Sequence, residues 1–176
     1  MNTSTIDYEK LIGRGKEKAE LRISLSAEVF SLNSANFVAE QLRLIDIELR
    51  SIVVEASRES DIYWATTLTS RDDYKGWENF CRIGTRVVFR KGTFSAEWFK
   101  NRYVSKGEGL PKDVFSTYLR KGKGFSCPAS NFKSEPKWVQ EQVAITDAKY
   151  ARLREKAALL TSMRRALRVY ERLSVD

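Results

Sequence analysis

The chain has 176 residues, of which 42% are hydrophobic and 31% are charged, with a formal net charge of +8. This length and apolar content suffice for one domain with a buried core, and they exclude a wholly disordered chain. The chain contains no histidine, which excludes Ser-His-Asp hydrolases, Cys-His proteases and histidine-ligated zinc or iron centres.

The cysteine content and the first residues bear on the compartment. The two cysteines, Cys81 and Cys127, are too few for a secreted disulfide framework and are not spaced as a metal site. The start of the chain lacks the apolar stretch of a signal peptide, and no apolar run approaches the ~18 residues that a membrane span needs. We therefore expect a cytoplasmic protein that contacts no membrane and uses no cofactor or metal.

Charge is distributed unevenly along the chain. Residues 1–81 carry a net charge of −4, residues 82–138 carry +9, and residues 139–176 carry +3. The middle third also holds 10 of the 20 aromatic residues. A basic segment of this kind attracts polyanions by releasing their counterions, and interleaved rings favour a binding surface over a solvated face.

The first third predicts a flexible arm over residues 1–15, followed by a long helix over residues 16–58. Two glycines, Gly13 and Gly15, interrupt any earlier helix. Apolar residues then recur at alternating spacings of four and three, which is the pattern of one buried helix face. These residues are Val38, Leu42, Ile45, Leu49, Ile52 and Ala56.

The central region, residues 59–133, is basic and aromatic and differs in kind from its flanks. Residues 85–94 alternate as a half-buried strand does, and Lys91-Gly92 predicts a tight turn, so a β-hairpin is expected. Residues 95–104 fit either the return strand or a short helix. A two-turn helix is expected from Pro111 to Gly122, followed by a loop rich in glycine, serine and proline.

The last third predicts a second long helix over residues 134–173. Ser134 can cap it, Glu135 suits the positive end of its dipole, and Pro136 suits its first turn. The expected fold is mainly α with a small β element (α+β). Its two long helices pack as an antiparallel pair, within one chain or across a homodimer, and bracket the compact central region in a single domain of residues 16–176.

The sequence predicts anion-binding residues but no catalytic ones. Arginine forks and lysine ammonium groups match phosphate geometry, and aromatic rings can stack on unpaired bases or wedge between base pairs. The candidate phosphate contacts are Arg82, Arg86, Arg90, Lys91, Lys100, Arg102, Lys106, Lys112, Arg120, Lys121, Lys123 and Lys133. The candidate stacking rings are Phe94, Trp98, Phe99, Tyr103 and Phe125.

Enzymatic chemistry has little support. No Walker phosphate-binding loop is present, and a Mg²⁺-dependent nuclease built on carboxylates alone is the one catalytic alternative that stays open. We expect that the protein is not an enzyme.

Two segments resemble the MobI-type mobilisation proteins of integrative conjugative elements and related plasmids. They are "RKGTFSAEWFKNRY" (residues 90–103) and "YLRKGKGFSCPASNF" (residues 118–132). The resemblance implies a small accessory factor that acts at the origin of transfer and helps a separate relaxase to initiate DNA processing. It provides no functional residues to carry over.

The leading hypothesis is a non-enzymatic protein that binds double-stranded DNA at an origin of transfer and recruits a relaxase. An alternative is a helical adaptor or regulator, encoded by a phage or plasmid, whose basic segment docks on an acidic protein partner. A further alternative is an RNA-binding protein. A steep fall of DNA affinity with salt would distinguish the first from the second, and a preference for single strands would indicate the third.

Overall fold

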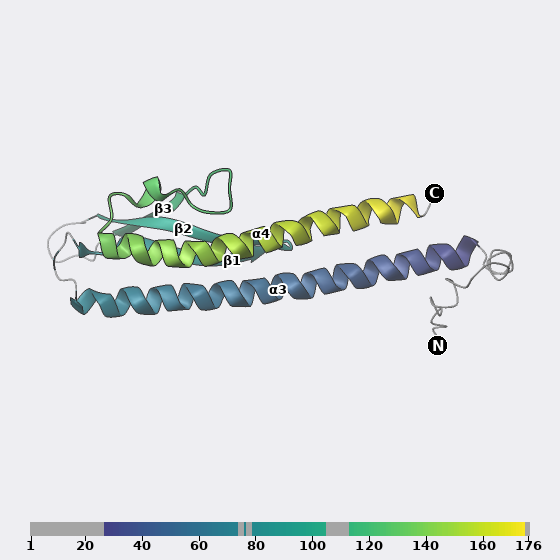
Figure 1. Ribbon diagram of the computed structural model, residues 1–176, viewed down its shortest axis with the longest axis horizontal. Coiled ribbons are helices and arrows are strands. Elements are labelled where there is room, and N and C mark those ends of the chain that lie inside the picture. The colour runs from purple at the N-terminus through teal and green to yellow at the C-terminus, as the bar shows by residue number, and fades with distance from the viewer. Residues whose placement is uncertain (1–26, 74–75, 77–78, 105–112, 175–176) are drawn as a thin grey trace. The chain divides into compact units, whose positions relative to one another are not determined.

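A computed structural model describes residues 27–73, 76, 79–104 and 113–174 of the protein. The elements follow in the order α3 (Ala27–Asp73), β1 (Ile83–Arg90), β2 (Thr93–Val104), β3 (Asp113–Leu119), the 3-10 helix η2 (Ala129–Phe132) and α4 (Lys137–Leu173) (Figure 1). Two long helices and a small sheet confirm the predicted α+β class. The chain forms two compact units, one of residues Leu44–Arg164 and one that combines Met1–Arg43 with Arg165–Asp176.

Helix α3 follows the predicted apolar stripe and then continues beyond its predicted end. Ile45, Leu49 and Ile52 are all at most 4% exposed. The helix ends at Asp73 instead of residue 58, because the buried stripe continues through Ser60 and Thr67, whose small polar side chains do not register as an apolar pattern. The predicted arm and the predicted helical residues 16–26 lie outside the described residues.

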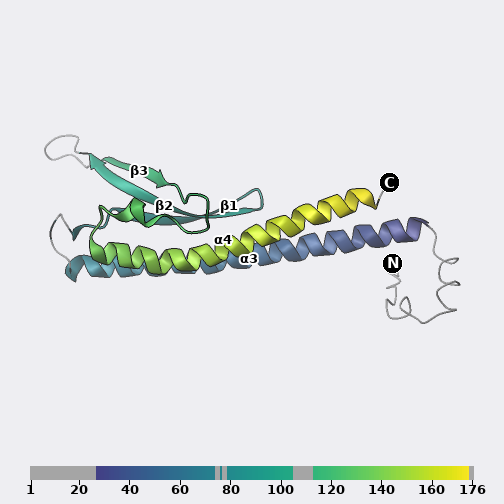
Figure 2. The same cartoon turned by 45° about the horizontal axis from the view of Figure 1, so that its top comes forward.

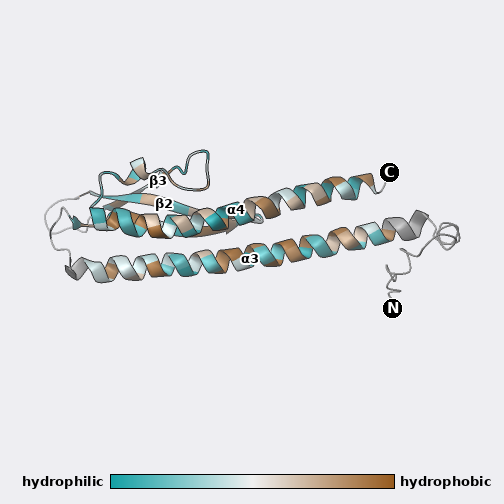
Figure 3. Cartoon of the chain, viewed as in Figure 1, coloured by the Kyte–Doolittle hydropathy of each residue, from teal (hydrophilic) through white to brown (hydrophobic). Residues whose placement is uncertain are grey.

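Helix α4 begins at Lys137, three residues after its predicted start, and ends at Leu173 as predicted. Because α4 begins at Lys137, Ser134 lies two residues before the capping position, and its hydroxyl accepts a hydrogen bond from Lys100 Nζ at 2.8 Å. The first helical bond is instead donated by Gln140 N to Pro136 O at 3.0 Å. Along both helices, apolar and hydrophilic residues alternate in patches, as stripes on a helix do (Figure 3).

Within the unit of residues Leu44–Arg164, α3 and α4 run antiparallel. Lys149 of α4 pairs with Glu59 of α3 at 2.6 Å, and Arg164, further along α4, pairs with Asp46, which lies earlier in α3. Residue numbers therefore rise along one helix as they fall along the other. The predicted antiparallel pair is confirmed within a single chain.

The central region forms a three-stranded antiparallel sheet in the order β1-β2-β3. The predicted hairpin is confirmed, with Arg90 opposite Thr93 and Ile83 opposite Lys100. Lys91 and Gly92 have φ values of 50° and 72°, and positive φ at both turn residues matches the strand twist of a two-residue hairpin. Of the two alternatives for residues 95–104, the return strand is correct.

The helix predicted from Pro111 to Gly122 is wrong over its described part. Residues Asp113–Leu119 form strand β3, which pairs with β2 from Trp98 opposite Leu119 to Val104 opposite Asp113. The sequence of this segment, DVFSTYL, is rich in β-branched and aromatic residues that suit a strand. The proline and glycine that flank it therefore bound a strand, and they were misread as helix signals.

The core lies where the sheet meets both helices. The Trp98 ring of β2 packs against Tyr63 of α3 at 5.1 Å between centroids, against Tyr150 of α4 at 5.6 Å and against Phe132 of η2 at 5.9 Å. These four side chains are at most 4% exposed. Figure 2 shows the sheet above the helix pair, with β3 on the side away from α3.

Gly84 allows a second ring to lie across strand β1. A Cβ atom at this position would lie 2.4 Å from the Phe99 ring and 2.9 Å from the Trp64 ring, which is closer than side chains approach. The Phe99 and Trp64 rings themselves lie 6.5 Å apart. A glycine is therefore required where Phe99 covers the strand.

The second unit brings the described part of residues 27–43 together with the end of α4. Phe37 packs edge-on against Tyr170 with 6.1 Å between ring centroids, and Ser34 Oγ lies 3.5 Å from the Tyr170 hydroxyl. Both rings stay about half exposed.

Candidate nucleic-acid interface

The turn of the β1-β2 hairpin presents two cations to solvent. Arg90 and Lys91 are both exposed, on either side of the strand end. Helix α4 contacts the turn, because its Arg164 donates a hydrogen bond to Gly92 O at 3.1 Å. The same guanidinium pairs with Asp46 of α3, which fixes its position. The hydrogen bond from Arg164 therefore fixes the backbone of the turn next to Arg90 and Lys91.

The loop of residues 120–128 carries a second group of cations. It is fixed at three points by buried or half-buried groups: Cys127 N donates to Asp147 at 2.7 Å, Arg154 donates to Phe125 O at 2.6 Å, and Asn131 donates to Arg120 O at 3.0 Å. These bonds hold the backbone, while the side chains of Arg120 and Lys123 remain exposed.

Lys121 belongs to the same loop but turns inward. Its Nζ donates to Gly124 O at 2.8 Å and lies 5.9 Å from the centroid of the Phe125 ring. An ammonium above a ring face is attracted by the ring quadrupole, so this lysine stabilises the loop.

Three of the predicted phosphate contacts form ion pairs with carboxylates of the chain. Glu135, whose side chain has no exposed surface, pairs with Lys100 at 2.7 Å and with Arg82 at 3.2 Å. Arg86 pairs with Glu97 across the hairpin at 2.7 Å. Sequence alone did not reveal these partners, because Glu135 lies 35 residues from Lys100 along the chain. These three cations therefore have partners within the chain and stay predicted phosphate contacts.

Six predicted cations are exposed and form no ion pair with any described residue. They lie at the hairpin turn, near the end of β2, in the loop after β3 and after η2. These exposed cations are Arg90, Lys91, Arg102, Arg120, Lys123 and Lys133. Lys106 and Lys112, which were also predicted, lie outside the described residues.

Two of the predicted stacking rings belong to the core. Trp98 is 1% exposed and donates from Nε1 to the Asp147 carboxylate at 2.8 Å, and Phe94 is 9% exposed. Both rings are buried in this structure and pack in the core. Phe99 is half-buried against Trp64, and Tyr103 packs edge-on against Phe80 at 5.6 Å. Phe125 is 38% exposed, as a stacking ring requires.

Sequence reasoning missed two exposed rings on β3. Phe115 is 53% exposed and Tyr118 is 49% exposed. Because their numbers differ in parity, they lie on opposite faces of the strand. The prediction of a helix for this segment did not place these rings on a sheet. The β-branched and aromatic composition of the segment was the signal that could have identified them.

A shallow pocket of about 320 Å³ lies beside the paired cations. Lys100, Arg102 and Thr117 line it, together with the apolar Leu119. One carboxylate, Glu135, balances two cations here, so the pocket keeps a positive surplus. Among the described residues, no cluster of three or more acidic or cysteine side chains could hold a metal ion.

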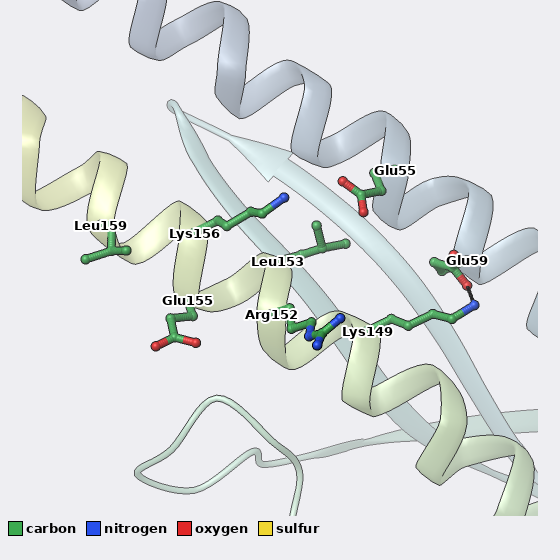
Figure 4. Close-up of a pocket in the computed structure, with 8 residues that line it drawn as sticks. All are labelled: Glu55, Glu59, Lys149, Arg152, Leu153, Glu155, Lys156 and Leu159. Atoms are coloured by element: carbon green, nitrogen blue, oxygen red, sulfur yellow. Dashed lines mark hydrogen bonds and ion pairs between the residues drawn. The ribbon is translucent and has the colours of Figure 1, made fainter.

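The groove between α3 and α4 differs in its charge balance. It has a volume of about 590 Å³ and is lined by three acidic and three basic side chains, with Leu153 and Leu159 between them. Figure 4 shows Lys149 bonded to Glu59, Lys156 extending toward the side of Glu55, and Glu155 pointing away from α3. Equal numbers of both signs do not attract a polyanion, so this groove is a poor DNA site.

Burial sets the protonation of the groups behind the loop. The Cys127 thiol has a raised pKa, because burial disfavours the thiolate. Burial likewise raises the pKa of the Tyr150 hydroxyl, which accepts a hydrogen bond from Thr85 at 3.1 Å. Both groups therefore stay neutral at physiological pH and pack in the core.

Comparison with known proteins supports one assignment. The family model described as MobI protein matches residues 52–168, about two thirds of the chain. The matched range includes all three strands, η2 and most of α4, and thus both segments that carried the sequence resemblance. No curated protein and no solved structure matches the chain. None of the helices in its described part is long and apolar enough to cross a bilayer. The chain belongs to the MobI family, and its membership indicates an accessory role in mobilisation.

Proposed function

We propose that this protein binds duplex DNA at an origin of transfer and helps a separate relaxase to begin processing that DNA. Family membership supports the mobilisation context. The observation that supports DNA binding is the contrast between six exposed cations around the sheet, which form no ion pair with a described residue, and the balanced charges of the helix groove.

The sheet has a positive surplus that its own carboxylates do not remove. Its described segments, residues 82–104 and 113–137, contain eleven Lys or Arg and three Asp or Glu. Two of those acids, Glu97 and Glu135, are already engaged by three cations. Each cation that approaches a phosphate would release a condensed counterion, which is the main source of affinity in sequence-independent DNA binding.

The spacing of the exposed cations suits a duplex. Strand β2 separates Thr93, next to the hairpin turn, from Arg102 by nine residue steps. At about 3.3 Å per residue this is about 30 Å, close to the ~34 Å of one turn of B-DNA. Phosphates one turn apart on the same face of a duplex could therefore contact both ends of the sheet.

Titration of a labelled origin-of-transfer duplex with the protein at several salt concentrations tests the proposal. We expect log affinity to fall linearly with log salt, and the variant Arg102→Ala/Lys123→Ala/Lys133→Ala to bind more weakly with a slope reduced by up to about 2.7. The matched control is Arg58→Ala/Arg152→Ala/Lys156→Ala, which removes three exposed cations from the helices. Equal losses in the two variants would show that only net charge matters.

The relaxase part of the proposal needs its own measurement. The protein alone should leave a supercoiled plasmid intact with Mg²⁺, whereas its addition should raise nicking by the cognate relaxase. Mg²⁺-dependent cutting by the protein alone, abolished by EDTA, would instead support the carboxylate nuclease.

A further inference from the structure

The two outer edges of the sheet differ in how their backbone groups are satisfied. On β1, Tyr63 donates a hydrogen bond to Ile83 O at 3.1 Å, and Trp64 donates to Thr85 O at 3.1 Å. Helix α3 therefore covers the Ile83–Thr85 part of this edge with side-chain donors. A strand cannot add to this part of β1 without displacing Tyr63, which is 1% exposed, and the half-buried Trp64.

Covered acceptors also occur where β2 extends beyond β3. Ala96 O accepts two hydrogen bonds from the Arg154 guanidinium, at 2.8 and 3.3 Å. Arg154 is buried and pairs with Asp147 at 2.9 Å, so this cover is held firmly in place. The fold thus protects the Ile83–Thr85 part of the β1 edge and Ala96, in the part of β2 that does not pair with β3.

The ladder identifies the backbone groups of β3 that face outward. Asn101 N donates to Arg82 O at 2.8 Å, so the odd-numbered residues of β2 face β1 and the even-numbered residues face β3. Their partners on β3 are Asp113, Phe115, Thr117 and Leu119. The outward N–H and C=O groups therefore belong to Val114, Ser116 and Tyr118, and no described residue bonds to them.

Strand β3 also lacks the features that protect natural edge strands. Such strands carry lysine, proline, a bulge or a covering element. From Val114 to Leu119 it has no charge and no proline, and Val114, Phe115 and Tyr118 are each about half exposed. Figures 1 and 2 show it at the side of the sheet away from α3. From Val114 to Leu119 it is an uncharged edge with exposed apolar side chains, and no described residue hydrogen-bonds to its outward backbone groups.

We propose that the open edge of β3 pairs with β3 of a second copy of this chain, which gives an antiparallel, two-fold symmetric dimer with a continuous six-stranded sheet. Because the same edge of both copies is used in the shared contact, the assembly closes as a dimer and does not grow into a filament.

The strand is complementary to itself in one register. Centring the two-fold axis on Ser116 pairs all seven residues and places outward backbone groups opposite each other. Val114 then lies opposite Tyr118 on one face, and Phe115 opposite Thr117 on the other, which are favourable cross-strand pairs. The one charged residue of the strand, Asp113, lies opposite Leu119, beside Arg120 of opposite sign. An unrelated peptide has no reason to match this pattern, which is why we favour a second copy.

Strand pairing alone buries less surface than a standard interface, so the dimer should dissociate on dilution. Sedimentation equilibrium of the full chain over a range of concentrations, without DNA, is the first test. We expect wild-type protein to shift from monomer to dimer as its concentration rises. Ser116→Pro should remain monomeric, because proline removes an outward N–H and leaves the backbone bonds to β2 intact; it also removes the Ser116 hydroxyl that donates to Asn101 at 2.7 Å, as does the alanine control. Ser116→Ala, which keeps the N–H, is the matched control and should dimerise.

Cross-linking tests the register. Ser116→Cys places two thiols at the two-fold axis, whereas both native cysteines are buried. Oxidised glutathione should convert this variant to a disulfide-linked dimer faster than Ser51→Cys, which carries an exposed thiol on α3.

Several outcomes would overturn the proposal: a wild-type monomer at all concentrations, a dimer that persists in Ser116→Pro, or equal cross-linking in the two cysteine variants. Should circular dichroism show that Ser116→Pro does not fold, Ser116→Lys replaces it. That variant places like charges opposite each other and should abolish the dimer to the same extent. None of these measurements depends on DNA binding.

Discussion

The inner part of the sheet, and the outer part formed by β3 and the loop after it, both contain aromatic rings and have cations nearby, but their environments differ. Around Trp98, where the helices cover the sheet, the rings are buried, and Lys100 and Arg154 have carboxylate partners. On β3 and the loop after it, Phe115 and Tyr118 are half exposed and Lys123 has no described ion-pair partner. Basic and aromatic content alone therefore does not distinguish core from surface, whereas coverage by α3 and α4 does.

Replacing Trp98 with alanine should have the largest effect. The change removes a ring that contacts both helices and η2, and it leaves Asp147 without one of its donors. We expect a loss of about 3–5 kcal/mol in the free energy of unfolding, measured by urea denaturation.

DNA affinity per folded molecule should be unchanged in Trp98→Ala, because the ring is not at the surface. Tyr118→Ala, which removes an exposed ring, is the control and should change stability by less than about 1 kcal/mol. The division between inner and outer rings is wrong if Tyr118→Ala costs as much stability as Trp98→Ala.

The sequence predicts those parts of the fold that depend on local periodicity. The stripe from Val38 to Ala56 and the Lys91-Gly92 turn both correspond to observed elements, because helix faces and two-residue hairpins are encoded within a few residues. Strand β3 depends on pairing with β2, and its flanking proline and glycine suggested a helix. Pairing with β2, which lies about 15 residues away along the chain, makes this segment a strand instead of a helix.

The candidate site was predictable only as a list of charges. Whether Lys100 or Arg102 is exposed depends on the location of Glu135, which the chain brings to the sheet from the start of α4. The two cations are two residues apart and lie on the same face of β2, so no local pattern separates them. Identifying the available cations therefore requires the tertiary structure.

Neutralising Glu135 should have an intermediate effect. Glu135→Gln leaves Arg82 and Lys100 without their shared carboxylate, and both are about 30% exposed, so water compensates in part. We expect a loss of about 1–3 kcal/mol in the free energy of unfolding. DNA affinity should rise, and its salt dependence should steepen, because two cations become available.

Glu141→Gln is the matched control for that charge change. Glu141 is an exposed residue of α4, and its neutralisation should alter stability by no more than about 0.5 kcal/mol. Weaker DNA binding by folded Glu135→Gln would contradict the division between paired and available cations. It would indicate that Glu135 positions Lys100 for contact with DNA.

The smallest effect should come from the Tyr63 hydroxyl. Burial raises the pKa of Tyr63 well above its ordinary value of 10.0, because the phenolate would be desolvated beside Cys81. Below pH 10 both the folded and unfolded states keep this proton, so the Tyr63 hydroxyl makes no contribution to the pH dependence of stability there. Above pH 10 the unfolded state releases the proton while the folded state retains it, so stability falls as pH rises.

Tyr63→Phe lacks the hydrogen bond to Ile83 O, so its free energy of unfolding at neutral pH should be about 1 kcal/mol lower than that of the wild type. The decline of its stability above pH 10 should also be less steep. Urea denaturation at pH 7 and at several values above 10 measures both effects. Tyr118→Phe removes an exposed hydroxyl from β3 and should leave the alkaline decline as steep as in the wild type. If the two variants flatten the decline equally, the buried Tyr63 and the exposed Tyr118 do not differ in the way that their exposures indicate.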